Sequence, residues 1–268
     1  MLQAEPSEPQ SPAIPKQVLT IDLAGAVAGR VNEPNASFYQ VPSEATVDFL
    51  QRHSLSGPSL YWDAGVRGDY FSFDNRSPFL LQHLQSYAAQ FGLEYFVGSE
   101  AVASLTLRPG FYFESDLTLS SWDIPLDFVT GVPIKQGFSG ILGVSAARFY
   151  HRPIPIVGFS WTIDPRYRLD LAYPNPALVM QVKTGFEARL AGTLIGDGYR
   201  LDSDTGRSKV EYSEYRVGPA VTVEIRPGIK LIGDAGYSVF RRFDFFSESQ
   251  RFDTGGAPYV HVGVELSR

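Results

Sequence analysis

Four histidines and two serines beside glycine are the side chains of this 268-residue chain best suited to nucleophilic or metal chemistry. The histidines are scattered and lack the spacing of a metal site; they are His53, His83, His151 and His261. Ser139 and Ser160 each follow a Gly-Phe pair, but neither stands in the G-x-S-x-G turn that exposes a nucleophile before a helix. We therefore expect no enzyme activity, no metal site and no cofactor.

Nine charged residues alternate with apolar ones, and this second group indicates a different kind of chemistry. In a confined wall, opposite charges either line an aqueous pore or pair across it and close it. Both outcomes stay open. Asp63, Arg67 and Asp69 are two to four residues apart on one face and could form a local network, and His261 would lie near Glu265. The nine are Asp63, Arg67, Asp69, Glu94, Arg108, Arg216, Glu224, Lys230 and Asp234.

Aromatic residues and an arginine pair suggest contacts with a membrane interface. Arg241, Arg242 and Phe243 begin a run of aromatic residues that could hold lipopolysaccharide-type headgroups, or form an aromatic girdle whose arginines pair with nearby acids. Trp62, Trp122 and Trp161 are predicted to face outer-membrane lipid as part of the same belt.

The elements that must position these residues are strands, because apolar and polar residues alternate with a period of two. The alternation is clearest in seven segments: 17–31, 59–73, 84–96, 101–114, 209–225, 229–240 and 259–267. It is weaker in five more: 122–132, 138–149, 154–163, 167–182 and 186–201. Several strands are longer than the five or six residues typical of globular proteins, and long enough for the ~9–11 of a tilted membrane strand.

Short and long connections separate these strands. Tight turns are expected at 97–100, 134–137, 164–166, 183–185 and 226–228, with longer polar loops near 32–58, 115–121, 202–208 and 244–256. Twelve strands result. An alternative of fourteen adds 38–50 as a strand and splits 167–182 at Pro174 and Pro176; it puts all five tight turns on one rim, but makes two strands that look too short to span. We prefer twelve.

Composition limits the class of protein. Charged residues make up 19% and aromatic residues 13%, and the mean hydropathy is -0.09. No apolar run approaches the ~20 residues of a membrane helix, so the apolar residues must be spread by alternation, as in membrane barrels. The net charge of -6 offers no basic footprint for nucleic acid, and the absence of cysteine excludes disulfides.

The polar faces of these strands carry Gly, Ala, Ser and Thr beside charges of both signs, which suits a crowded lumen better than a solvated exterior. The fold expected is therefore all-β: a transmembrane antiparallel up-and-down β-barrel over residues 17–268, after a disordered tail over residues 1–16. Because no signal-peptide core is present, we expect that an export signal has been removed.

Particular motifs also carry a family resemblance. The run Tyr167-Arg-Leu-Asp-Leu-Ala-Tyr-Pro-Asn-Pro176, with Gly198-Tyr-Arg200 and Gly236-Tyr-Ser-Val-Phe-Arg-Arg-Phe-Asp244, resembles an uncharacterised family of outer-membrane β-barrels, defined as a domain of unknown function, over about residues 60–268. The resemblance implies the outer membrane of a Gram-negative-type bacterium and supplies no catalytic residues. Such barrels commonly end in an aromatic residue that the barrel-insertion machinery recognises, whereas this chain ends in Arg268, so its insertion signal is atypical or truncated.

Three functions follow from these features. The first is a passive channel for small hydrophilic solutes. The second is a structural or scaffolding barrel with a closed, salt-bridged lumen. The third is a soluble all-β barrel whose apolar face encloses a ligand.

Overall fold

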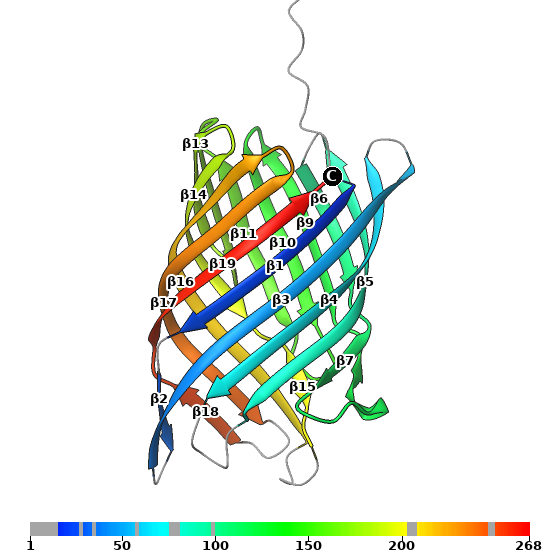
Figure 1. Cartoon of the computed structure of the whole chain (residues 1–268). Helices are drawn as coiled ribbons and strands as arrows, with labels where there is room; N and C mark the ends of the chain where they lie inside the picture. The colour runs from blue at the N-terminus through cyan, green and yellow to red at the C-terminus, as the bar shows by residue number, and fades with distance from the viewer. Residues whose placement is uncertain are drawn as a thin grey trace, which may run out of the picture.

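The computed structural model is a tilted-strand β-barrel (Figure 1). It describes residues 16–26, 29–33, 36–56, 59–74, 81–97, 100–202, 208–245 and 250–268. Among these residues, no helix has the length and apolar character needed to cross a membrane. The expected tail lies outside the described residues except for Lys16. The backbone nitrogen of Lys16 donates to the Arg268 carbonyl oxygen at 2.8 Å, so the first and last residues of the barrel-forming segment meet at one rim.

Fourteen strands in the described part of the chain form a closed ring, and each is antiparallel to its neighbours. The ring closes where β19 pairs with β1, from Val18 opposite Ser267 to Ala26 opposite Tyr259. We call it the wide ring. Its strands are β1 (Gln17–Ala26), β3 (Ala36–Ser56), β4 (Leu60–Asp74), β5 (His83–Val97), β6 (Glu100–Leu107), β9 (Leu126–Lys135), β10 (Phe138–Ala146), β11 (Ile154–Thr162), β12 (Tyr167–Tyr173), β13 (Ala177–Lys183), β14 (Phe186–Ile195), β16 (Lys209–Arg226), β17 (Ile229–Phe245) and β19 (Ala257–Ser267).

The preferred count of twelve strands is therefore wrong, and the fourteen-strand alternative is confirmed. The segment predicted to be a long loop near 32–58 contains β3. The inward residues Glu44, Thr46 and Asp48 are polar, so the composition of this segment is like that of a loop. Residues 167–182 form two seven-residue strands, β12 and β13. They separate at Pro174 and Pro176, where the missing N–H groups interrupt the ladder.

The five tight turns lie on the rim that also holds the two ends of the barrel, at the top of Figure 1. We call this the short-turn rim and the opposite one the long-loop rim. Most connections on the long-loop rim are longer, such as 108–125 between β6 and β9, which contains the short 3-10 helix η1 (Leu119–Ser121). Short turns on one side and longer loops on the other are typical of outer-membrane barrels.

Within the described residues, five shorter strands extend the barrel towards the long-loop rim: β2 (Gly29–Glu33), β7 (Gly110–Phe113), β8 (Trp122–Asp123), β15 (Gly198–Arg200) and β18 (Gln250–Thr254). The chain changes direction between β14 and β15, and β15 pairs with β7, with Arg200 opposite Phe113. In the described residues, this pairing closes a second, narrower ring of nine strands: β2, β3, β4, β5, β7, β15, β16, β17 and β18. An odd ring cannot alternate direction throughout, and β7 and β15 are parallel. The narrow ring thus bypasses β9–β13.

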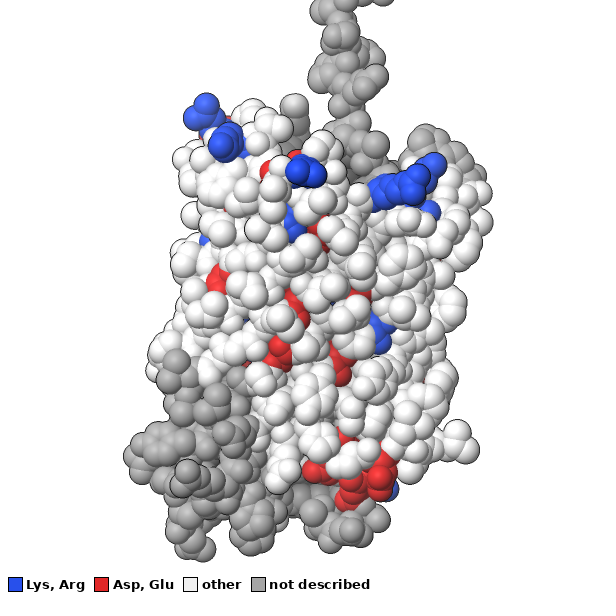
Figure 2. Space-filling view, in the orientation of Figure 1, with Lys and Arg blue, Asp and Glu red and all other residues white. Residues whose placement is uncertain are grey.

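Side chains alternate between the outside of the barrel and its lumen along the strands. In β5, Tyr87 and Phe91 are 54% and 50% exposed, whereas Ser86, which is on the inward face, is 1% exposed. The outward residues are apolar on nearly every strand, as a membrane barrel requires. Figure 2 shows Lys and Arg gathered at the short-turn rim and a group of Asp and Glu near the opposite end, with a mostly uncharged surface between them.

Candidate functional site: the lumen

The lumen opens widely at the short-turn rim. A cavity of about 1030 Å³ begins there between β6 and β12. Its wall is built mainly from small or weakly polar side chains, including Ser104, Gly131, Ser139 and Ser160. Because such side chains take little space, this sector of the barrel leaves room for water and small solutes.

Deeper in the lumen, β3, β4 and β5 hold the first of three charged groups. Arg67 Nη2 donates to Asp69 Oδ1 at 2.9 Å, and its Nη1 is 3.7 Å from Asp48 Oδ2. The hydroxyls of Thr46 and Ser86 also donate to Asp69, each at 2.9 Å. Asp69 is therefore fully engaged, whereas Asp48 has a longer contact with the same guanidinium.

The second charged group crosses the lumen. Arg216 on β16 lies 3.0 Å from Glu44 on β3 and 3.1 Å from Glu214 on its own strand. Since β17, β19 and β1 lie between β16 and β3 in the wide ring, the first contact is a chord across the interior. Glu214 also accepts from Arg241 at 3.3 Å and from the Tyr212 hydroxyl at 2.8 Å. Glu214 and Arg241 are completely buried.

The third charged group places one imidazole between two carboxylates. His261 on β19 lies 2.5 Å from Asp234 through Nδ1 and 3.1 Å from Asp22 through Nε2. Carboxylates accept hydrogen bonds, so both contacts are hydrogen bonds only when both ring nitrogens carry protons. The three groups together form what we call the charged belt: six carboxylates, three arginines and one histidine.

Residues from the charged belt line a cavity of about 260 Å³ in the middle of the barrel. A second cavity of about 470 Å³ continues from it, because Glu44, Arg67 and Thr193 belong to the walls of both. This second cavity reaches Tyr150 and Asn175, which lie in the loops that follow β10 and β12. We call it the shoulder cavity, since it lies where β10–β13 end and the narrow ring continues.

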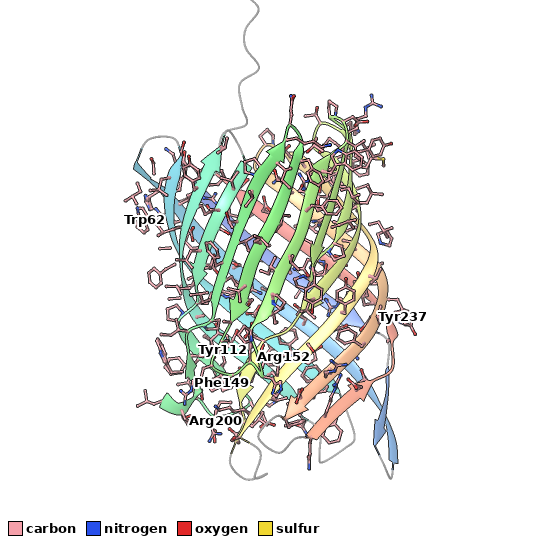
Figure 3. The ribbon with its side chains drawn as sticks, turned by 180° about the vertical axis from the view of Figure 1, so that it is seen from behind. Trp62, Tyr112, Phe149, Arg152, Arg200 and Tyr237 are labelled. Carbon is pink, nitrogen blue, oxygen red and sulfur yellow. The ribbon has the colours of Figure 1, made fainter. Side chains whose placement is uncertain are left out.

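The narrow ring itself is filled by an aromatic cluster. The rings of Phe73, Tyr212 and Phe243 contact one another with centroids 5.1 Å apart, and each side chain is at most 1% exposed. Tyr112, Phe149 and Tyr199 belong to the same buried group. Figure 3 shows Tyr112 and Phe149 at the long-loop end of the barrel. A path along the barrel axis from the short-turn rim therefore ends in a packed apolar core.

The nine charged residues proposed for the lumen fall into several groups. Arg67, Asp69, Arg216 and Asp234 belong to the charged belt. Asp63 lies apart from Arg67 and Asp69, with its carboxylate against Gly92 on β5. Glu94 on the same strand accepts from Arg52 at 2.5 Å.

The remaining members lie further from the belt. Arg108 pairs with Asp127 in the wall of the shoulder cavity. Lys230 pairs with Glu265 at 2.8 Å, so Glu265 is engaged there and His261 is held by other carboxylates. Glu224 is exposed at the short-turn rim, where the backbone nitrogen of Gly228 donates to it at 3.3 Å.

Glu44 and Asp48 are belt residues that the sequence did not single out, because their segment was predicted to be a loop. The alternation of Ala45, Val47 and Phe49 with these acids could have found them. Among the described residues, no group of three or more His, Asp or Glu is arranged to hold a metal ion.

The residues proposed for the membrane interface divide between the two faces. Trp62, Trp122 and Trp161 are between 39% and 42% exposed on the outside, and Trp62 is visible there in Figure 3. Arg242 is on the outside as well, with its guanidinium 5.2 Å from the Phe240 ring and a 2.7 Å contact to Asp253.

For Arg241 and Phe243 the interface prediction is wrong, because both are buried in the interior. The cause is a β-bulge in β17. Tyr215 pairs with Phe240 and Arg216 with Ser238, which leaves Val239 without a partner. One extra residue moves every later side chain to the opposite face.

No curated protein matches this sequence. Among solved structures, an outer membrane channel from Pseudomonas putida F1 matches 99% of this chain with all of its own length, at 10% identity and a TM-score of 0.55. The translocator domain of the autotransporter NalP from Neisseria meningitidis matches 96% of this chain with 90% of its own, at 11% identity and a TM-score of 0.41. The first likeness supports the fold, which is that of outer-membrane barrels.

One family model also matches, over residues 134–266, which run from the end of β9 to the penultimate residue of β19. This is narrower than the resemblance noted above, since residues 60–133 lie outside it. Over these residues the chain matches the family described as a domain of unknown function, DUF6268, and its closed barrel is of the outer-membrane type.

Proposed function

We propose that this barrel spans an outer membrane, with its short-turn rim in the periplasm, and acts as a passive channel for small hydrophilic solutes. In this setting the outward apolar residues contact lipid. The observation that carries the proposal is the chain of polar cavities, in which the charged belt faces open space in the middle of the barrel. A lumen meant only for rigidity has no need of that space.

The route we propose does not follow the barrel axis to its end. A solute enters at the short-turn rim, passes the charged belt and turns into the shoulder cavity, because the aromatic cluster fills the narrow ring beyond it. The shoulder cavity has polar groups along its whole length, from Arg67 and Asp69 at the belt to Asn175 in the loop after β12. It is therefore a wetter path than the core of the narrow ring.

Single-channel recording in a planar bilayer tests this route. Thr193→Trp places a large side chain in the wall shared by the two inner cavities, so we expect its conductance to fall to less than half that of the parent protein. Leu190→Trp on the same strand is the matched control, because Leu190 is 56% exposed on the outside. An equal conductance for all three proteins would show that the current does not pass Thr193.

A closed structural barrel is the second candidate, and a specific observation favours it. The Arg216–Glu44 chord and the packed aromatic cluster both obstruct the lumen along its axis. The absence of current steps from a protein with the heat-modifiable gel migration of a folded barrel would favour this candidate and end the channel proposal.

A further inference from the structure

We infer that the lumen favours cations over anions, so that the channel proposed above serves small cationic solutes. The inference presupposes a water-filled lumen and goes beyond it, because it names the charge of the solute. It rests on the balance and the pairing of charges around the two inner cavities.

The charged belt has an excess of negative charge. Six carboxylates face three guanidiniums and one imidazole, so its net charge is about −2 even when His261 is protonated. The shoulder cavity continues this excess, since the charged residues that line it beyond the belt are two carboxylates, Asp127 and Asp197, and one guanidinium, Arg108. Walls of low dielectric around a narrow lumen strengthen the field of such an imbalance.

The pairing of the charges acts in the same direction. Each belt arginine has a carboxylate partner: Arg67 pairs with Asp69 and Asp48, Arg216 with Glu44 and Glu214, and Arg241 with Glu214. An entering anion therefore meets no guanidinium without a carboxylate partner, and the guanidinium N–H groups of Arg216 and Arg241 that lack a hydrogen-bond partner are buried. A cation finds Asp48, whose contact with Arg67 is 3.7 Å and leaves its oxygens available.

The outer part of the lumen does not set this preference. The cavity at the short-turn rim is lined by two cations, Lys135 and Arg168, and two carboxylates, Asp164 and Asp170. Its charges balance, so discrimination between cations and anions occurs at the belt. Rings of acidic side chains select cations in other channels by the same principle.

The absence of cysteine from this chain permits a direct test. Thr193→Cys introduces a single thiol into the wall shared by the inner cavities. Gln136→Cys provides a reference thiol in an exposed turn at the mouth of the rim cavity, where the charges balance. We would measure the modification rates of each thiol in the folded, detergent-solubilised protein with a cationic and an anionic methanethiosulfonate. The cationic-to-anionic ratio for the Thr193→Cys protein, divided by that for the Gln136→Cys protein, corrects for the intrinsic reactivities of the two reagents.

We expect this normalised ratio to be about 10 or more, the lower end of the range by which charged clefts concentrate their counter-ions. Adding Asp48→Asn to the Thr193→Cys protein should lower this normalised ratio several-fold. Asp253→Asn is the matched control and should leave it unchanged, because Asp253 pairs with Arg242 and Arg251 outside the lumen. A ratio of one or less would overturn the inference, as would a thiol that reacts only after unfolding.

Reversal potentials in a KCl gradient separate this inference from the proposed channel. A reversal potential nearer the equilibrium potential of chloride than that of potassium contradicts the inference and leaves the channel proposal intact. Conversely, a high normalised ratio without any current steps supports a cation-attracting lumen and contradicts the channel.

Discussion

Arg241 and Arg242 are sequence neighbours in opposite environments, and they show how much a single residue's position in this wall matters. Arg241 is completely buried and bonded to Glu214, whereas the Arg242 side chain is 32% exposed and pairs with the still more exposed Asp253. Loss of one member of a buried ion pair leaves an uncompensated charge, but an exposed pair contributes little.

We therefore predict that Arg241→Ala lowers the free energy of unfolding by about 3–5 kcal/mol, whereas Arg242→Ala lowers it by about 0–1 kcal/mol. Denaturant unfolding followed by tryptophan fluorescence measures both variants. Similar losses for the two would mean that Glu214 is satisfied without Arg241.

The sequence predicted many residues of the lumen but not its pairings. Period-two alternation placed Arg216 and Asp234 on the polar faces, because alternation is a local property of each strand. It could not detect the bulge at Val239, since Val239 and Phe240 are both apolar and either residue can occupy the outward position. The chord between Glu44 and Arg216 joins residues far apart in sequence, which no local pattern records.

At the scale of elements, Gly196 is the point where β14 gives way to β15. Its φ of +134° is a conformation that other residues rarely adopt, and an added Cβ would lie 2.0 Å from the Tyr212 carbonyl oxygen. The change of direction here brings β15 to β7, so the narrow ring depends on this glycine.

Gly196→Ala should lower stability by about 1–3 kcal/mol from backbone strain alone. Gly25→Ala is the control, because a Cβ there meets nothing within 4 Å, and its stability should be unchanged or slightly raised. The same unfolding measurement compares them. If both variants unfold at the same denaturant concentration as the parent, the turn at Gly196 tolerates a side chain.

Most strands could be predicted, and the exceptions have physical causes. The acids and Pro42 of β3 disguise its alternation, while β12 and β13 are too short to look like membrane strands. They suffice because the narrow ring bypasses them, so they need not extend to its far end.

The whole molecule is a wide polar barrel joined to a narrow barrel with an apolar core. The sequence predicted the first from composition and alternation. The second depends on the pairing of Arg200 with Phe113, which is set by tertiary contacts and leaves no periodic trace.

Reducing the aromatic cluster should open the axial route. We predict that Phe243→Ala increases the single-channel conductance, because the side chain fills the narrow ring and contacts Phe73 and Tyr212. Phe91→Ala removes an outward aromatic side chain of the same type and should leave the conductance unchanged. Heat-modifiable migration would establish that both variants are folded, and an unaltered conductance for folded Phe243→Ala would show that the axial route stays closed.

The narrow ring bypasses β9–β13, and this divides the barrel wall into two sectors that differ in their tolerance to the loss or duplication of strands. Strands that belong to both rings pair with neighbours in each ring, and the β10–β11 loop contributes Phe149 to the aromatic cluster, whereas the β12–β13 hairpin belongs to the wide ring alone. A hairpin contributes two antiparallel strands, so its loss or duplication preserves the alternation needed for closure. A barrel of this design can therefore change diameter, over evolution or by engineering, through loss or duplication of the β12–β13 hairpin while the apolar end keeps its form.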